Sequence, residues 1–151
     1  MNAHRDFELL AVTIQGEGRP DVPVSAQVDR QHDAPGSPGA PQPAETVSVS
    51  LKEGAEFRLR LEFRVHSRDD LEGLKFIEEH TRQGVVVVHT ETHLGDYRRG
   101  GPYEIVLPPV HLATGHLARD RYECTGTFVD GDGRELGRMT FRLEITKEWP
   151  Q

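Results

Sequence analysis

Apolar and polar residues alternate along several segments of this chain. Residues 57–65 alternate between apolar and charged side chains, which is typical of a strand with one buried and one solvated face. The same alternation predicts strands over residues 22–28 and 139–146. Pro23 has no amide hydrogen to donate, so the strand over 22–28 is expected at a sheet edge.

Other segments also carry strand signals, although 74–81 fits a helical spacing as well, through Leu71, Leu74 and Ile77. The further predicted strands are 7–14, 46–51, 74–81, 85–94, 103–107 and 121–129. Glycines at 82–84, 98–101 and 130–134 indicate turns, because glycine adopts positive φ readily. Many short strands between regular turns favour an antiparallel sandwich or barrel of eight or nine strands.

Residues 33–45 interrupt this pattern with four prolines and no large apolar side chain. Such a segment cannot bury enough surface to offset its ordering entropy. We expect a mobile loop between two strands, within a single domain that spans residues 1–151.

The net charge of −7 disfavours nucleic acid as a partner, because phosphates are repelled by an acidic protein. The one cysteine excludes an intrachain disulfide and fits a reducing compartment. The first ten residues lack the apolar stretch of a signal peptide, and no apolar run is long enough to span a bilayer. We therefore expect a cytoplasmic monomer without stable membrane insertion.

Two motifs suggest a metal at first sight. His89, Glu91 and His93 would share one face of a strand, but the two histidines would lie about 13 Å apart, too far for one ion. The segment 130–135 has the look of a calcium loop, but Arg134 and Phe141 stand where an EF-hand needs oxygen ligands. The sequence predicts neither a metal nor a cofactor.

The sequence also lacks the glycine-rich and nucleophile motifs of common enzyme families. Cys124 lies in an alternating strand and is interpreted as a core residue rather than a nucleophile. No catalytic residue is predicted, and the chain is not expected to be an enzyme.

Five segments resemble, in order, the immunoglobulin-like domain of Rho GDP-dissociation inhibitors. They are LKEGAEFRLRLEFRV (51–65), GLKFIEEHTRQGVVV (73–87), LGDY (94–97), TGHLARDRYECTGTFVDGDG (114–133) and LEITKEW (143–149). A weaker similarity at FELLAVTIQGEGRPDVPVSAQV extends the resemblance to about residues 7–149. The resemblance implies an immunoglobulin-like β-sandwich that holds the geranylgeranyl or farnesyl group of a Rho-type GTPase, or of another lipidated protein, between its sheets.

Alternation nominates the inward side chains that would line such a lipid slot. They are Leu61, Phe63, Phe76, Val87, Tyr122, Phe128, Phe141 and Leu143. An acidic cluster is the candidate to meet a basic tail beside the lipid. It comprises Asp69, Asp70, Glu72, Glu78 and Glu79. Alternatively, the inward side chains fill a closed core and the acidic residues form a solvated surface, which would leave a protein-binding module without a lipid ligand.

The chain departs from the family pattern in three places. Only residues 1–6 precede the first predicted strand, so the family's N-terminal arm, which clamps the GTPase switch regions, is expected to be missing. The proline-rich loop at 33–45 replaces the family's connection between the second and third strands. Phe141 stands where the family usually has a tryptophan in the pocket. Lipid capture is thus expected to survive without the arm, whereas slowing of GDP release is expected to be weak or absent.

Overall fold

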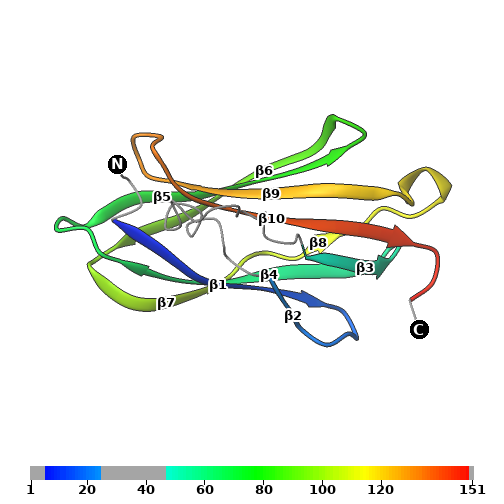
Figure 1. The fold of residues 1–151 in the computed structure, drawn as a ribbon, viewed down its shortest axis with the longest axis horizontal. Coiled ribbons are helices and arrows are strands. Elements are labelled where there is room, and N and C mark those ends of the chain that lie inside the picture. The colour runs from blue at the N-terminus through cyan, green and yellow to red at the C-terminus, as the bar shows by residue number, and fades with distance from the viewer. Residues whose placement is uncertain (1–5, 25–46, 150–151) are drawn as a thin grey trace, which may run out of the picture.

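The computed structural model describes residues 6–24 and 47–149. Within them, ten strands form two facing sheets (Figure 1). The strands are β1 (Phe7–Gly16), β2 (Val22–Val24), β3 (Ser48–Lys52), β4 (Glu56–Val65), β5 (Leu71–Arg82), β6 (Val85–Tyr97), β7 (Gly100–Val106), β8 (Val110–His111), β9 (Arg121–Val129) and β10 (Glu135–Thr146). One turn of 3-10 helix, η3 (His116–Ala118), precedes β9. The predicted β-sandwich is confirmed, with ten described strands instead of the eight or nine expected.

The first sheet has the order β2-β1-β4-β7, and β8 pairs with the start of β4. All of its pairings are antiparallel. The alternating segment 57–65 forms most of β4, and its five apolar side chains are all buried. The short edge strand β2 includes Pro23, as expected, while residues 25–28 of that predicted strand lie outside the described residues.

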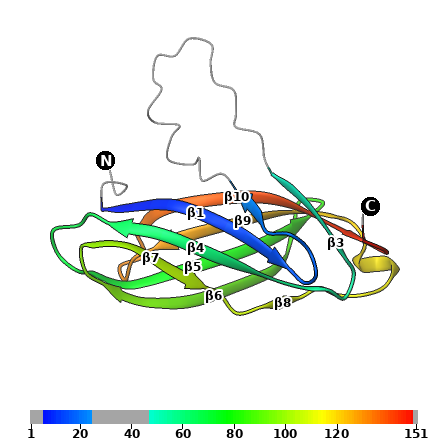
Figure 2. The ribbon, with the colours of Figure 1, turned by 90° about the horizontal axis from the view of Figure 1, so that it is seen from below.

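The second sheet has the order β3-β10-β9-β5-β6. The strand β3 runs parallel to β10, so this sheet is mixed rather than wholly antiparallel as predicted. Such long-range pairing between residues 48–52 and 142–146 leaves no local signal in the sequence. The ambiguous segment 74–81 is strand throughout and lies within β5. Figure 2 shows β1, β4 and β7 lying over the strands of this second sheet.

The space between the sheets is filled by one hydrophobic core. The ring of Phe7 lies 5.3 Å from that of Phe63 and 5.0 Å from that of Phe128, while Phe76 and Phe128 are 4.9 Å apart between centroids. These contacts join both sheets, because Phe7 and Phe63 come from the first sheet and Phe76 and Phe128 from the second. Each buried phenylalanine stabilises the fold by roughly 1.5–3 kcal/mol.

The tight turn between β5 and β6 takes the form its sequence predicts. Gln83 and Gly84 have φ of 52° and 82°, and two consecutive positive φ values suit the right-handed twist of a hairpin.

Two elements were not predicted, β8 and η3, and both lie in the connection from the first sheet to the second. The proline-rich segment 33–45 falls outside the described residues. In the described part of the chain, no helix has the length and apolar character needed to cross a bilayer.

Candidate functional site

Seven of the eight side chains nominated for a lipid slot lie between the sheets. Their exposed fractions do not exceed 8%, and all seven belong to the hydrophobic core. They are Leu61, Phe63, Phe76, Tyr122, Phe128, Phe141 and Leu143. Two come from β4 in the first sheet, and the other five come from β5, β9 and β10 in the second. The nominated residues therefore face one another across the sandwich.

The eighth nominated residue, Val87, does not face inward and that prediction is wrong. Its side chain is 49% exposed. The pairing of β5 with β6 shifts between His80 and Thr81, which pair with Val88 and Val86, so Val87 is the extra residue of a β-bulge. Val88 takes the inward position instead and is half-buried.

The edge strands β6 and β7 meet through aromatic side chains. Tyr97 of β6 contacts Tyr103 of β7 at 5.0 Å between ring centroids, and both rings contact Phe63, at 5.1 and 5.7 Å. Leu94 and Ile105 lie on the same two strands, and all four side chains are half-buried against the core. This β6/β7 edge, comprising Leu94, Tyr97, Tyr103 and Ile105, is one place where apolar side chains packed against the core reach the surface between the two sheets.

Polar groups hold the β6/β7 edge in place. The hydroxyl of Tyr97 donates to the carbonyl of Leu94 at 2.6 Å, and that of Tyr103 donates to the carbonyl of Arg98 at 2.8 Å. Burial raises the pKa of the Tyr97 phenol, with a smaller contribution from Tyr103. This edge was not predicted from the sequence, although Tyr103 and Ile105 alternate with polar or exposed residues within the predicted strand 103–107.

The acidic cluster predicted from the sequence is divided among three places. Asp69, Asp70 and Glu72 lie together at the start of β5. Glu78 points inward and is only 6% exposed, so it is not available to a basic tail. Glu79 lies on the outer face of β5, where it contacts Nδ1 of His89 at 2.8 Å. The prediction of one five-residue cluster is wrong, because Glu78 and Glu79 point to opposite faces of β5 and lie about 20 Å along the strand from Glu72.

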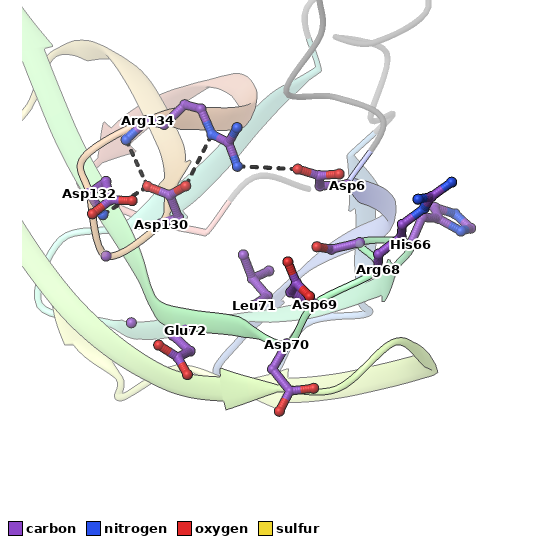
Figure 3. Close-up of a pocket in the computed structure, with 13 residues that line it drawn as sticks. Asp6, His66, Arg68, Asp69, Asp70, Leu71, Glu72, Asp130, Asp132 and Arg134 are labelled. Carbon is purple, nitrogen blue, oxygen red and sulfur yellow. Dashed lines mark hydrogen bonds and ion pairs between the residues drawn. The ribbon is translucent and has the colours of Figure 1, made fainter.

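The three remaining acidic residues line a cleft of about 830 Å³ at one end of the sandwich (Figure 3). Its charged lining has six carboxylates but only two arginines. The carboxylates are those of Asp6, Asp69, Asp70, Glu72, Asp130 and Asp132. Leu71 also lines the cleft and pairs with Tyr97 of β6, so the acidic end cleft adjoins the β6/β7 edge.

Two of these carboxylates have a structural role. Oδ1 of Asp130 accepts the backbone N–H groups of Asp132 and Arg134, both at 2.9 Å, which closes the turn between β9 and β10. The guanidinium of Arg134 donates to Asp130 at 3.1 Å and to Asp6 at 3.2 Å. Figure 3 shows this arginine between the two aspartates, while Asp69, Asp70 and Glu72 lie on the other side of the cleft.

The candidate metal and nucleophile positions have ordinary structural environments. His89 lies between Glu79 and Glu91, which raise its pKa, and Glu91 is also paired with Lys75 at 3.2 Å. Among residues 6–24 and 47–149, no group of three or more histidine, cysteine or acidic side chains is arranged to hold a metal ion. Cys124 is fully buried, and burial raises the pKa of its thiol far above the ordinary value, which fits the core interpretation.

Comparison with solved structures supports the fold. The C-terminal domain of wzt superposes with a TM-score of 0.58 over 95% of this chain and 75% of that one. The two sequences are only 12% identical, so the likeness concerns the sandwich architecture alone.

Comparison of sequences identifies the family. The model of the RHO protein GDP dissociation inhibitor family matches residues 2–148. The chain is 30% identical over 149 residues to the Rho GDP-dissociation inhibitor of Schizosaccharomyces pombe, covering 98% of this chain and 68% of that protein. It is 36% identical over 103 residues to Rho GDP-dissociation inhibitor 1 of Bos taurus, covering 68% of this chain and half of the bovine protein. The chain belongs to the RHO protein GDP dissociation inhibitor family.

Proposed function

We propose that this protein shields the prenyl group of a Rho-type small GTPase between its two sheets, as a binding protein rather than an enzyme. Membership of the family supports the GTPase as partner. The observation that carries the lipid part is the β6/β7 edge, where half-buried apolar side chains connect the surface with the core.

The energetics favour an apolar enclosure for such a group. Each methylene moved out of water contributes about 0.8 kcal/mol, so a polyprenyl chain in solution gains strongly from any slot that replaces the bilayer. The core is filled by its own side chains, and a bound lipid would have to displace some of them. Phe63 is the core side chain that such a lipid would meet beside the edge, because it contacts both Tyr97 and Tyr103.

The acidic end cleft would receive the polar part of the partner. Asp69, Asp70 and Glu72 lie beside Leu71, which pairs with Tyr97 of the β6/β7 edge. A prenylated terminus entering at that edge would therefore place the residues before its lipid next to carboxylates. A basic tail would be attracted there, most strongly at low ionic strength.

The test is a titration with a fluorescent geranylgeranyl- or farnesyl-cysteine peptide, beside the same peptide without lipid. Phe141→Ala should weaken binding of the lipidated peptide, because it removes an apolar side chain from the proposed wall of the slot, where Phe141 is 1% exposed. Thr140→Ala is the matched control, since its side chain lies on the exposed face of the same strand. Equal binding of the two peptides by the unaltered protein would contradict the proposal.

The competing function is a protein-binding module with a closed core. Tight packing around Gly126 favours it, because a Cβ there would lie 2.3 Å from Phe76. Under this alternative, a GTPase without its lipid would bind as tightly as the prenylated form. The same titration, repeated with both forms of the whole GTPase, separates the two functions.

A further inference from the structure

Exposed apolar side chains gather at the end of the sandwich opposite the acidic end cleft. Among the described residues, five large apolar side chains are exposed, and four of them come from two neighbouring segments. Val85, Val86 and Val87 open β6 with exposed fractions of 62%, 49% and 49%, and Leu117 of η3 is 75% exposed. We call these four residues the apolar tip.

Hydrogen bonds bring the two segments of the apolar tip together. Arg82, at the end of β5, donates from its guanidinium to the carbonyl of Leu117 at 2.7 Å and to Asp120 at 2.8 Å. Gln83, in the hairpin turn, donates to Asp120 at 3.1 Å. The valine hairpin and η3 are therefore neighbours at one end of the molecule (Figure 1).

The apolar tip is not explained by the fold. Three consecutive valines cannot all face the core, and the bulge at Val87 leaves all three at the surface. Exposed apolar side chains that cluster within a polar rim are typical of surfaces that contact a protein or a membrane. Because the three valines lie beside a hairpin turn at the end of the sandwich, they could insert into a soft partner surface.

The charges around the apolar tip favour an anionic partner. Between residues 82–87 and 116–121 there are three arginines, one histidine and one carboxylate, Asp120, and Glu53 adds a second carboxylate beside Arg119. Arg82 is paired with Asp120 and Arg119 with Glu53, while Arg121 and His116 are exposed. The opposite end carries six carboxylates against two arginines and one histidine, His66. An anionic surface would thus attract this end of the sandwich and repel the other.

We infer that the apolar tip touches an anionic lipid bilayer, with the valines and Leu117 in the headgroup region and Arg121 beside the phosphates. Apolar side chains flanked by cations bind such interfaces through combined insertion and charge attraction. The contact is peripheral and reversible, and it leaves the acidic end cleft facing away from the bilayer. This inference goes beyond the proposed shielding of a prenyl group and does not depend on it.

The test is sedimentation with vesicles of phosphatidylcholine and phosphatidylserine, using the full chain without any prenylated ligand. The variant Val86→Asp with Val87→Asp should lower vesicle binding by about tenfold or more, because two carboxylates would replace the inserted side chains. Val106→Asp is the matched control, since Val106 is 48% exposed but lies on β7 in the other sheet. Arg121→Glu should weaken binding, and vesicles of phosphatidylcholine alone should bind the unaltered protein more weakly.

Three outcomes would overturn the inference. The unaltered protein could fail to sediment with anionic vesicles, or the tip variant could bind as well as Val106→Asp. A concentration-dependent dimer abolished by the tip variant would instead assign the surface to a second copy of this chain. Titration of the same tip variant with the prenylated peptide keeps the two proposals distinct. If the variant loses vesicle binding but still binds the peptide, the apolar tip acts on the bilayer alone.

Discussion

Nε2 of His80 lies 2.7 Å from Oε2 of Glu78, between the two sheets. The side chains are 5% and 8% exposed, and the imidazole stacks near the ring of Phe57 at 6.4 Å between centroids. Both residues belong to β5, where alternate positions face the core, so the pair is a polar element built into an otherwise apolar interior. Removing ionisable groups from water is costly, and each partner offsets that cost for the other.

Replacing one member of this pair should be more damaging than replacing both. His80→Ala leaves the Glu78 carboxylate buried without its partner, and we expect a loss of about 3–5 kcal/mol in the free energy of unfolding. The double replacement Glu78→Leu with His80→Leu should restore most of that stability, because two apolar side chains need no partner. Chemical denaturation measures the free energy of unfolding of the single and the double variant. Equal losses of stability in the two would contradict the expected coupling.

The pair also illustrates what the sequence could predict. Alternation located β9 at its observed bounds, 121–129, and identified the buried face of β4. Applied to β5, the same alternation places Glu78 with Phe76 and His80 on the inward face, but its charge suggested a surface position. The predicted inward orientation of Val87 was wrong for a different reason. A run of four valines shows no alternation, and the β-bulge at Val87 depends on the pairing of β6 with β5. The parallel pairing of β3 with β10 joins residues far apart in the chain, so it could not be predicted from the local sequence pattern either.

Gly126 should tolerate no side chain. A Cβ at this position would meet two ring atoms of Phe76 at 2.3 and 2.6 Å and the sulfur of Met139 at 3.0 Å. We expect Gly126→Ala to lower the free energy of unfolding by about 1–3 kcal/mol, the usual cost of overpacking a core. Thermal unfolding would measure it beside Thr125→Ala, which alters the neighbouring half-buried residue. Similar melting temperatures for the two variants would show that Phe76 moves aside freely.

His89, on the outer face of the second sheet, should titrate above its ordinary pKa of 6.5, because Glu79 and Glu91 both contact its imidazole. A raised folded-state pKa means that the protonated form is stabilised by folding. This contribution is complete below about pH 6.5 and is lost as the pH rises through the raised pKa. NMR titration of His89 should show its pKa falling toward the ordinary value in Glu79→Gln. An unchanged pKa in that variant would assign the shift to Glu91 alone.

Cys124 should be unreactive in the folded protein. Its side chain is fully buried, and burial raises the pKa of the thiol, so little thiolate forms near neutral pH. A thiol-reactive dye should label the native chain far more slowly than the chain in denaturant. Rapid labelling under native conditions would reveal local opening around β9, which carries Cys124 and lies between β5 and β10 in the second sheet.

The last prediction concerns the route by which a lipid would enter. Ile105 and Val106 are adjacent on β7, but Ile105 is half-buried at the β6/β7 edge and pairs with Leu61, whereas Val106 is exposed and pairs with Arg60. A carboxylate at position 105 would stand in the apolar entrance, so Ile105→Glu should weaken binding of a prenylated peptide by more than about tenfold. Val106→Glu introduces the same charge one residue away, on the opposite face, and should bind as the unaltered protein does. Circular dichroism on both variants checks that the sandwich is intact. If the two variants bind the peptide equally well, the lipid does not pass between β6 and β7, and the edge strands β2 and β3 on the other side of the sandwich become the route to test.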